Sequence, residues 1–212
     1  MKNTIKKLII IFSLFIIYTI ICASSYAENL SSGIADSVFR LHVIANSDSQ
    51  EDQNLKYKVR DNLLEYLNSI SSNANSKEEI IKIVNEHKND FYNVAISTIK
   101  ENGFDYDVNI NVGNFLFPTK TYGDISLPSG SYDGLRVEIG TASGKNWWCV
   151  MFPPLCFVDV SSGIVPDSSK ETLQNNMSDE EYKIISDSTS EFKFKFKILE
   201  LFQNAKVLTA QK

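Results

Sequence analysis

His42, Asp48 and Asp52 are the side chains with the most obvious capacity for chemistry. Imidazole and carboxylate groups can bind a metal ion, or act together as acid and base. These three lie close together in the sequence, but their spacing matches no zinc or calcium ligand signature. The other histidine outside the N-terminal segment, His87, lies in an amphipathic pattern, which favours a structural role. The sequence therefore predicts no metal site and no cofactor.

Motifs that mark common enzyme classes are absent from the chain. It contains no G-x-S-x-G nucleophile elbow, no H-E-x-x-H zinc motif, no P-loop and no G-x-G-x-x-G. A serine–histidine–acid triad can be drawn in any serine-rich chain, and no serine here stands out. These absences make an enzyme less expected but do not exclude one. The net charge of −5 also makes nucleic acid an improbable partner.

The pair Trp147-Trp148 is the best indication of a binding surface. Neighbouring residues of a strand point to opposite faces of the sheet, so one tryptophan leaves the core unless both faces are covered. An exposed tryptophan is a favoured anchor for a protein partner. The pair therefore favours a binding module.

Two cysteines follow in the same region. In an exported protein Cys149 and Cys156 are expected to form a local disulfide across the Pro153-Pro154 corner. Two buried free thiols are the alternative. A redox-active site is disfavoured, because the cysteines lack the C-x-x-C spacing of redox and zinc pairs.

The stretch from Phe39 to Leu67 contains His42, Asp48 and Asp52, so its elements determine where these side chains lie. Alternation predicts a strand that begins at Phe39, and a 3.6-residue period predicts a helix that continues past Leu67. The intervening turn has capping-box spacing, either from Asp48 to Glu51 or from Ser49 to Asp52. Capping of this helix explains the residue types in the turn without any ligand.

The remaining pattern predicts the α+β class, with an antiparallel sheet of about four to five strands. A two-helix hairpin would cover one face, with its second helix running from about 76 to 102. A further helix is expected to begin near Phe194, and a strand at 191–197 is the alternative, because phenylalanines alternate with lysines there. We predict a lead-in at 28–37, a core domain at 38–160, a flexible polar linker at 161–177 and a C-terminal helical segment at 178–212.

Residues 1–27 are predicted to be an export signal. Three lysines precede an apolar run from Leu8 to Ile21, and small residues at Ser25 and Ala27 suit signal peptidase cleavage between Ala27 and Glu28. An uncleaved anchor is the alternative. Cleavage would remove three lysines and no acids, so that 18 basic residues face 26 acids and the net charge falls to −8.

Two long sequence blocks resemble the stage II sporulation protein R family. They are RLHVIANSD at 40–48, and NWWCVMFPPLCF at 146–157. The resemblance extends from about Arg40 to Val158 and is weaker in the tail. It implies a protein that is exported from the forespore to the space between the forespore and mother-cell membranes. There it would activate a membrane-embedded aspartic protease that processes the precursor of sigma-E.

The resemblance implies no catalytic residues and a protein that is not an enzyme, so the expected site is a contact surface. We predict that it includes Trp147, Trp148 and Phe152, together with Arg40, His42 and Asp48 from the first block. A secreted cell-wall hydrolase using His42 and Asp48, or an extracytoplasmic binding module, are the alternatives. The oligomeric state does not follow from the sequence.

Overall fold

A four-stranded mixed sheet forms the centre of the computed structural model, which describes residues 2–72, 74–156, 165–186, 195–201 and 203. The strands lie in the order β2-β5-β1-β6. Their bounds are Phe39–Ile44 for β1, Val108–Phe117 for β2, Gly130–Ile139 for β5 and Asn146–Phe152 for β6. A separate hairpin joins β3 (Lys120–Tyr122) to β4 (Ile125–Leu127).

The α+β class is confirmed, and the sheet differs from the expected one in a single pairing. β5 pairs antiparallel with β2, and β6 pairs antiparallel with β1, but β1 and β5 are parallel. Parallel strands need a long crossover. Here the crossover contains three helices, β2 and the β3–β4 hairpin, and β5 then inserts between β1 and β2.

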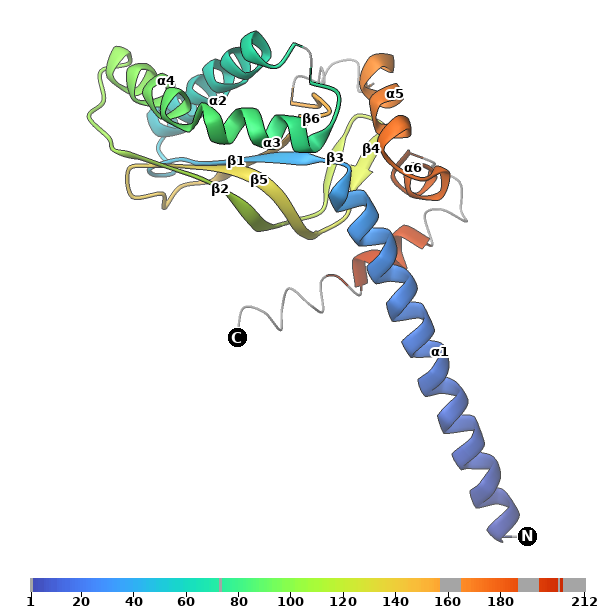
Figure 1. Ribbon diagram of the computed structural model, residues 1–212. Coiled ribbons are helices and arrows are strands. Elements are labelled where there is room, and N and C mark those ends of the chain that lie inside the picture. Colours follow the sequence, from blue (N-terminus) through green and yellow to red (C-terminus); the bar gives the residue numbers. More distant parts are fainter. Residues whose placement is uncertain (1, 73, 157–164, 187–194, 202, 204–212) are drawn as a thin grey trace.

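Three helices cover one face of the sheet (Figure 1). They are α2 (Gln50–Ile70), α3 (Lys77–Glu86) and α4 (Lys88–Glu101). The alternation of β1 directs Phe39, Leu41 and Val43 into this layer, where each is fully buried. The expected second helix is divided at His87, whose φ of −103° and ψ of 17° end α3 and begin α4.

A second apolar core lies on the opposite face, at one end of the sheet. It is formed by the last turns of α1 (Lys2–Asp36), the β3–β4 hairpin and α6 (Asp179–Ser186). Beyond its last turns α1 projects away from the domain with its apolar side chains exposed (Figure 1). It is long and apolar enough to span a membrane.

Two predicted irregular segments prove to be helical. Residues 28–36 continue α1 instead of forming a loose lead-in, because Leu30 and Ile34 are buried in the second core. The predicted flexible linker contains α5 (Asp167–Asn176), which Leu173 anchors by complete burial. The described residues 195–201 are also helical, as expected. The expected extended segment after Leu155 falls largely outside the described residues.

Candidate functional site

The two tryptophans of β6 lie on opposite faces of the sheet, and both are half-buried. Trp147 faces α2, where the guanidinium of Arg60 lies 4.3 Å from the centre of its ring. The ring of Tyr57 meets Trp147 edge-on at 5.3 Å. Because helices cover this face, only part of the Trp147 ring is accessible to a partner. The indole Nε1 of Trp147 has no hydrogen-bond acceptor among the described residues.

Trp148 lies on the other face and stacks on His42, with ring centres 3.6 Å apart. Nε2 of His42 is 2.7 Å from Oδ1 of Asn146, so the imidazole is held at both its face and its edge. Burial lowers the pKa of His42 to about 4, although the hydrogen bond with Asn146 opposes the shift. His42 is therefore neutral at pH 7.

Arg40 precedes His42 on the same face and is completely buried. Its guanidinium lies 4.3 Å from the ring centre of Phe117 and 4.7 Å from that of Tyr132. Nη2 donates to the hydroxyl of Tyr122 at 3.1 Å, whereas Nε and Nη1 have no acceptor in the described part of the chain. Burial raises the pKa of the Tyr122 and Tyr132 phenols, so both remain neutral around Arg40. Aromatic faces thus take the place of a counter-ion.

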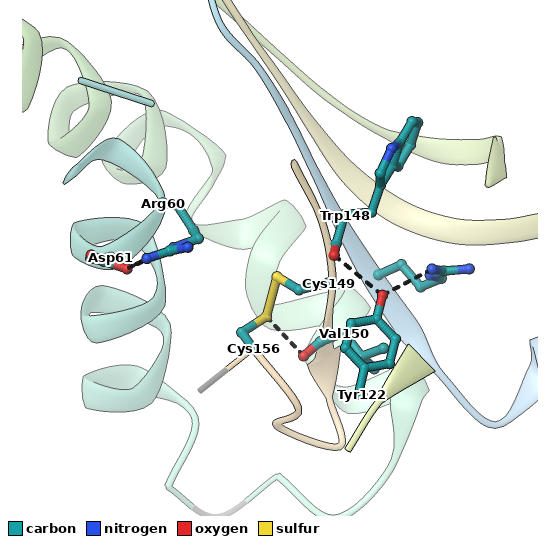
Figure 2. Close-up of a disulfide and its surroundings, with 8 residues drawn as sticks. Arg60, Asp61, Tyr122, Trp148, Cys149, Val150 and Cys156 are labelled. Carbon is teal, nitrogen blue, oxygen red and sulfur yellow. Dashed lines mark hydrogen bonds and ion pairs between the residues drawn. A yellow bond between two sulfur atoms is a disulfide. The ribbon is translucent and has the colours of Figure 1, made fainter. Parts of the chain in front are cut away.

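Tyr122 and the disulfide hold the outer edge of β6 (Figure 2). The hydroxyl of Tyr122 donates to the carbonyl oxygen of Trp148 at 3.3 Å. Cys149 is bonded to Cys156, which confirms the expected pairing. After the corner, the backbone N–H of Leu155 donates to the carbonyl oxygen of Val150 at 3.1 Å. The bonded Sγ of Cys156 is 3.0 Å from the same oxygen.

The acids of the turn after β1 serve local structure. Ser49 caps α2, accepting from the backbone N–H of Asp52 at 3.2 Å. Asp52 accepts from Ser47 Oγ at 2.6 Å and from Asn46 Nδ2 at 2.9 Å. Burial alone would raise the pKa of Asp52, but these hydrogen bonds hold it below its usual value. Asp48 accepts from the backbone N–H of Lys145 at 2.7 Å.

His42, Asp48 and Asp52 are therefore not assembled as a ligand set. Within the described ranges, no three histidine, cysteine, aspartate or glutamate side chains are placed to hold a metal ion. The residues of this region instead support packing and capping.

The predicted contact residues divide by exposure. Arg40, His42 and Phe152 have exposed fractions of 0%, 5% and 5%, so none of them can touch a partner directly in this conformation. Trp147 and Trp148 are half-buried and Asp48 is exposed. Sequence reasoning missed four residues that contact the tryptophans, because each comes from a distant segment; they are Tyr57, Arg60, Phe117 and Tyr122. We call Trp147, Trp148, Tyr57, Arg60 and His42 the tryptophan cluster.

The predicted cleavage position lies inside α1. Ala27 is 1% exposed in the second core, and the neighbouring Tyr26 donates to Oε1 of Glu180 at 2.5 Å. A peptidase could reach this bond only before the domain folds around it.

Comparison with known proteins identifies the family. Residues 35–162 match the family described as stage II sporulation protein R. Stage II sporulation protein R of Bacillus subtilis (strain 168) is 35% identical over 137 residues, which is 65% of this chain and 61% of the relative. The match thus spans less than two thirds of the relative's length. No solved structure gives a significant match. The chain belongs to the stage II sporulation protein R family.

Proposed function

We propose that this protein is an exported, non-enzymatic signal of endospore formation. It activates the membrane-embedded aspartic protease that processes the sigma-E precursor. The family match over residues 35–162 carries this proposal. The exposed apolar part of α1 supports export or membrane attachment, and the disulfide suits an oxidising compartment outside the cytoplasm.

Activation of a protease by a bound protein requires a difference in affinity. A ligand shifts an equilibrium only when it binds the active state better than the inactive one. The bound domain therefore contacts a region of the protease that differs between these states. For an exported activator, that region lies on the outer side of the protease's membrane.

The tryptophan cluster is the part of the domain best suited to this contact. Tryptophan and arginine are enriched among the residues that dominate binding energy. Trp147 and Arg60 approach the outer edge of β6 from the helix side, and Trp148 approaches it from the other side. His42 holds the ring of Trp148 in place, so it acts by positioning.

Reconstitution in a non-sporulating host tests the function. We expect processing of the sigma-E precursor only when the protease and this protein are expressed together. Absence of processing with the unaltered protein would overturn the proposed function. Release of soluble muropeptides from cell wall by the purified protein, lost in His42→Ala and Asp48→Ala, would favour the hydrolase instead.

Substitutions in the tryptophan cluster test the contact. Trp147→Ala and Trp148→Ala are expected to reduce processing at least tenfold while the protein is still exported and folded. Tyr92→Ala is the matched control, because Tyr92 is an exposed aromatic residue of α4 outside the cluster. Normal processing by both tryptophan variants would show that the contact lies elsewhere. The proposed function would not be contradicted by that result.

A further inference from the structure

The two edge strands of the sheet, β6 and β2, differ in whether their outward backbone groups are hydrogen-bonded. A bare edge strand presents a row of unpaired N–H and C=O groups that can pair with another strand. At the β6 edge, the carbonyl oxygens of Trp148 and Val150 are occupied by Tyr122 and Leu155. The disulfide and the Pro153-Pro154 corner follow directly. This edge is closed to a further strand over its second half.

The β2 edge has its polar backbone groups directed outward. The carbonyl oxygen of Asp107 accepts from the N–H of Gly140 at 2.8 Å, so residue 107 bonds toward β5. Backbone directions alternate along a strand. The N–H and C=O groups of the even-numbered residues from Val108 to Leu116 therefore point away from β5. No described segment hydrogen-bonds to them.

The side chains of β2 also lack the usual protection of an edge. Natural edge strands avoid pairing through charged residues, proline, bulges or short length. β2 is ten residues long, carries no charge and no proline, and pairs with β5 without a register shift. Leu116 is 38% exposed at this edge, and Val112 is half-buried.

We propose that β2 pairs antiparallel with β2 of a second copy of this chain. The two sheets then form one continuous sheet of eight strands, four from each copy. An isologous contact of this kind uses the same surface twice and closes as a dimer. Since β2 is uncharged, no like charges meet along the pair.

The charges that flank β2 favour the antiparallel arrangement. Asp105 and Asp107 precede the strand, and Lys120 follows it. In the described part of the chain none of the three forms an ion pair with another side chain. Antiparallel pairing brings the acidic end of one strand toward the basic end of the other, whereas parallel pairing would set acid against acid.

The position of α1 fits the same symmetry. α1 packs on the face opposite α2, α3 and α4 and leaves the domain on that side (Figure 1). A two-fold axis perpendicular to the sheet keeps the same face of both copies on one side. Both α1 helices can then enter a single membrane, which is the requirement for two copies attached by their N-terminal helices.

The mass of the full chain in detergent micelles, measured by sedimentation, tests the pairing. We expect a dimer for the unaltered chain and a monomer, with half the protein mass, for Val112→Pro. Proline removes an outward N–H and no bond to β5. Asn111→Ala, which alters a side chain of the same strand, is expected to stay dimeric. A monomeric unaltered chain would overturn the proposal, as would a dimer that survives Val112→Pro through contacts of α1.

Hydrogen exchange on the unaltered chain keeps the test decisive if Val112→Pro fails to fold. In the dimer, the amides of Ile110, Val112 and Asn114 are expected to exchange as slowly as those of Asn111 and Gly113. In a monomer the even-numbered amides face solvent and exchange at least tenfold faster. Fast exchange at these three amides would overturn the proposal. Slow exchange in a protein of monomeric mass would also overturn it, because another group would then cover the edge.

Discussion

Arg40 shows how a single buried charge organises one end of the molecule. A guanidinium without a carboxylate is costly to bury, and two of the nitrogen atoms of Arg40 lack acceptors within the described residues. The rings of Phe117 and Tyr132 offset part of this cost through cation–π contact. The strands pack tightly at this point: a Cβ at Gly134 would lie 2.7 Å from the carbonyl oxygen of Arg40.

Gly134→Ala is therefore expected to destabilise the domain. The new methyl group would press on backbone, which cannot move aside as a flexible side chain can, and such overpacking costs about 1–3 kcal/mol. Gly113→Ala is the matched control, because the nearest atom to its Cβ would be 3.5 Å away in the ring of Phe115. Urea denaturation followed by tryptophan fluorescence measures both. Equal stability of the two variants would contradict this account.

His42 is expected to make the domain sensitive to moderate acid. Its pKa is about 4 in the folded protein and about 6.5 in the unfolded chain, so between these values the unfolded state binds more protons. Folding stability is intact above pH 6.5 and falls as the pH drops toward 4. The loss at pH 4.5 from His42 alone is about 2–3 kcal/mol.

His42→Phe keeps an aromatic ring against Trp148 but cannot titrate. We expect the difference in unfolding free energy between pH 7 and pH 4.5 to be about 2–3 kcal/mol smaller in His42→Phe than in the unaltered protein. Carboxylates contribute equally to both proteins, so the comparison isolates His42. An identical pH dependence would show that His42 protonates freely in the folded state.

At the scale of elements, α1 has two parts with different roles. Its first part exposes apolar residues, such as Ile16 at 41%, whereas Ile34 near its end is completely buried. The end is further tied to the domain by Lys77, which lies 2.8 Å from Asp133 and 3.7 Å from Asp36. The last turns of α1 thus belong to the folded domain.

Ile34→Ala is expected to lower the stability of the domain by about 2–5 kcal/mol, the usual loss for truncating a buried isoleucine. Ile16→Ala is expected to change it by less than about 0.5 kcal/mol. Urea denaturation of the full chain in detergent micelles compares them. Equal effects would mean that α1 does not pack on the domain as described.

Local signals in the sequence predicted several elements well. Capping by Ser49, one of the two predicted alternatives, is confirmed at the start of α2, and the same spacing places Ser76 and Ser178 as caps of α3 and α6. Each signal involves residues within one turn, so the short-range pattern is sufficient. The alternation of β1 likewise identified the residues that pack against the helices, but β1 is buried on both faces.

Long-range features could not be predicted in this way. The parallel pairing of β1 with β5 depends on where a strand from residue 130 onward inserts, and no local pattern specifies this. The aromatic surroundings of Arg40 come from Phe117 and Tyr132, which are remote in sequence. The helical state of 28–36 depends on the second core into which Leu30 and Ile34 pack, and that core exists only in the folded domain.

At the scale of the whole molecule, the domain combines a closed edge, a bare edge and an apolar helix that projects from one face. The closed β6 edge carries the tryptophan cluster, and the bare β2 edge lies at the other end of the strand order. A dimer formed through β2 would therefore leave both tryptophan clusters free for partners. The two proposals are compatible, and each can fail without the other.

Processing of α1 determines whether this molecule is released or attached. Cleavage between Ala27 and Glu28 leaves Leu30 and Ile34 to hold the second core, so we expect the cleaved domain to fold. Ser25→Leu is expected to block cleavage, because signal peptidase needs a small residue at this position. Since Ser25 is exposed, its replacement does not disturb the core.

The expected result is a shift of the protein from the soluble to the membrane fraction, with an intact-protein mass that includes residues 1–27. Asn29→Leu, another exposed position of α1 but outside the recognised residues, is expected to be cleaved normally. If the unaltered protein already retains residues 1–27, as mass spectrometry would show, α1 is a permanent anchor. In that case the domain stays attached to the membrane and acts at its surface.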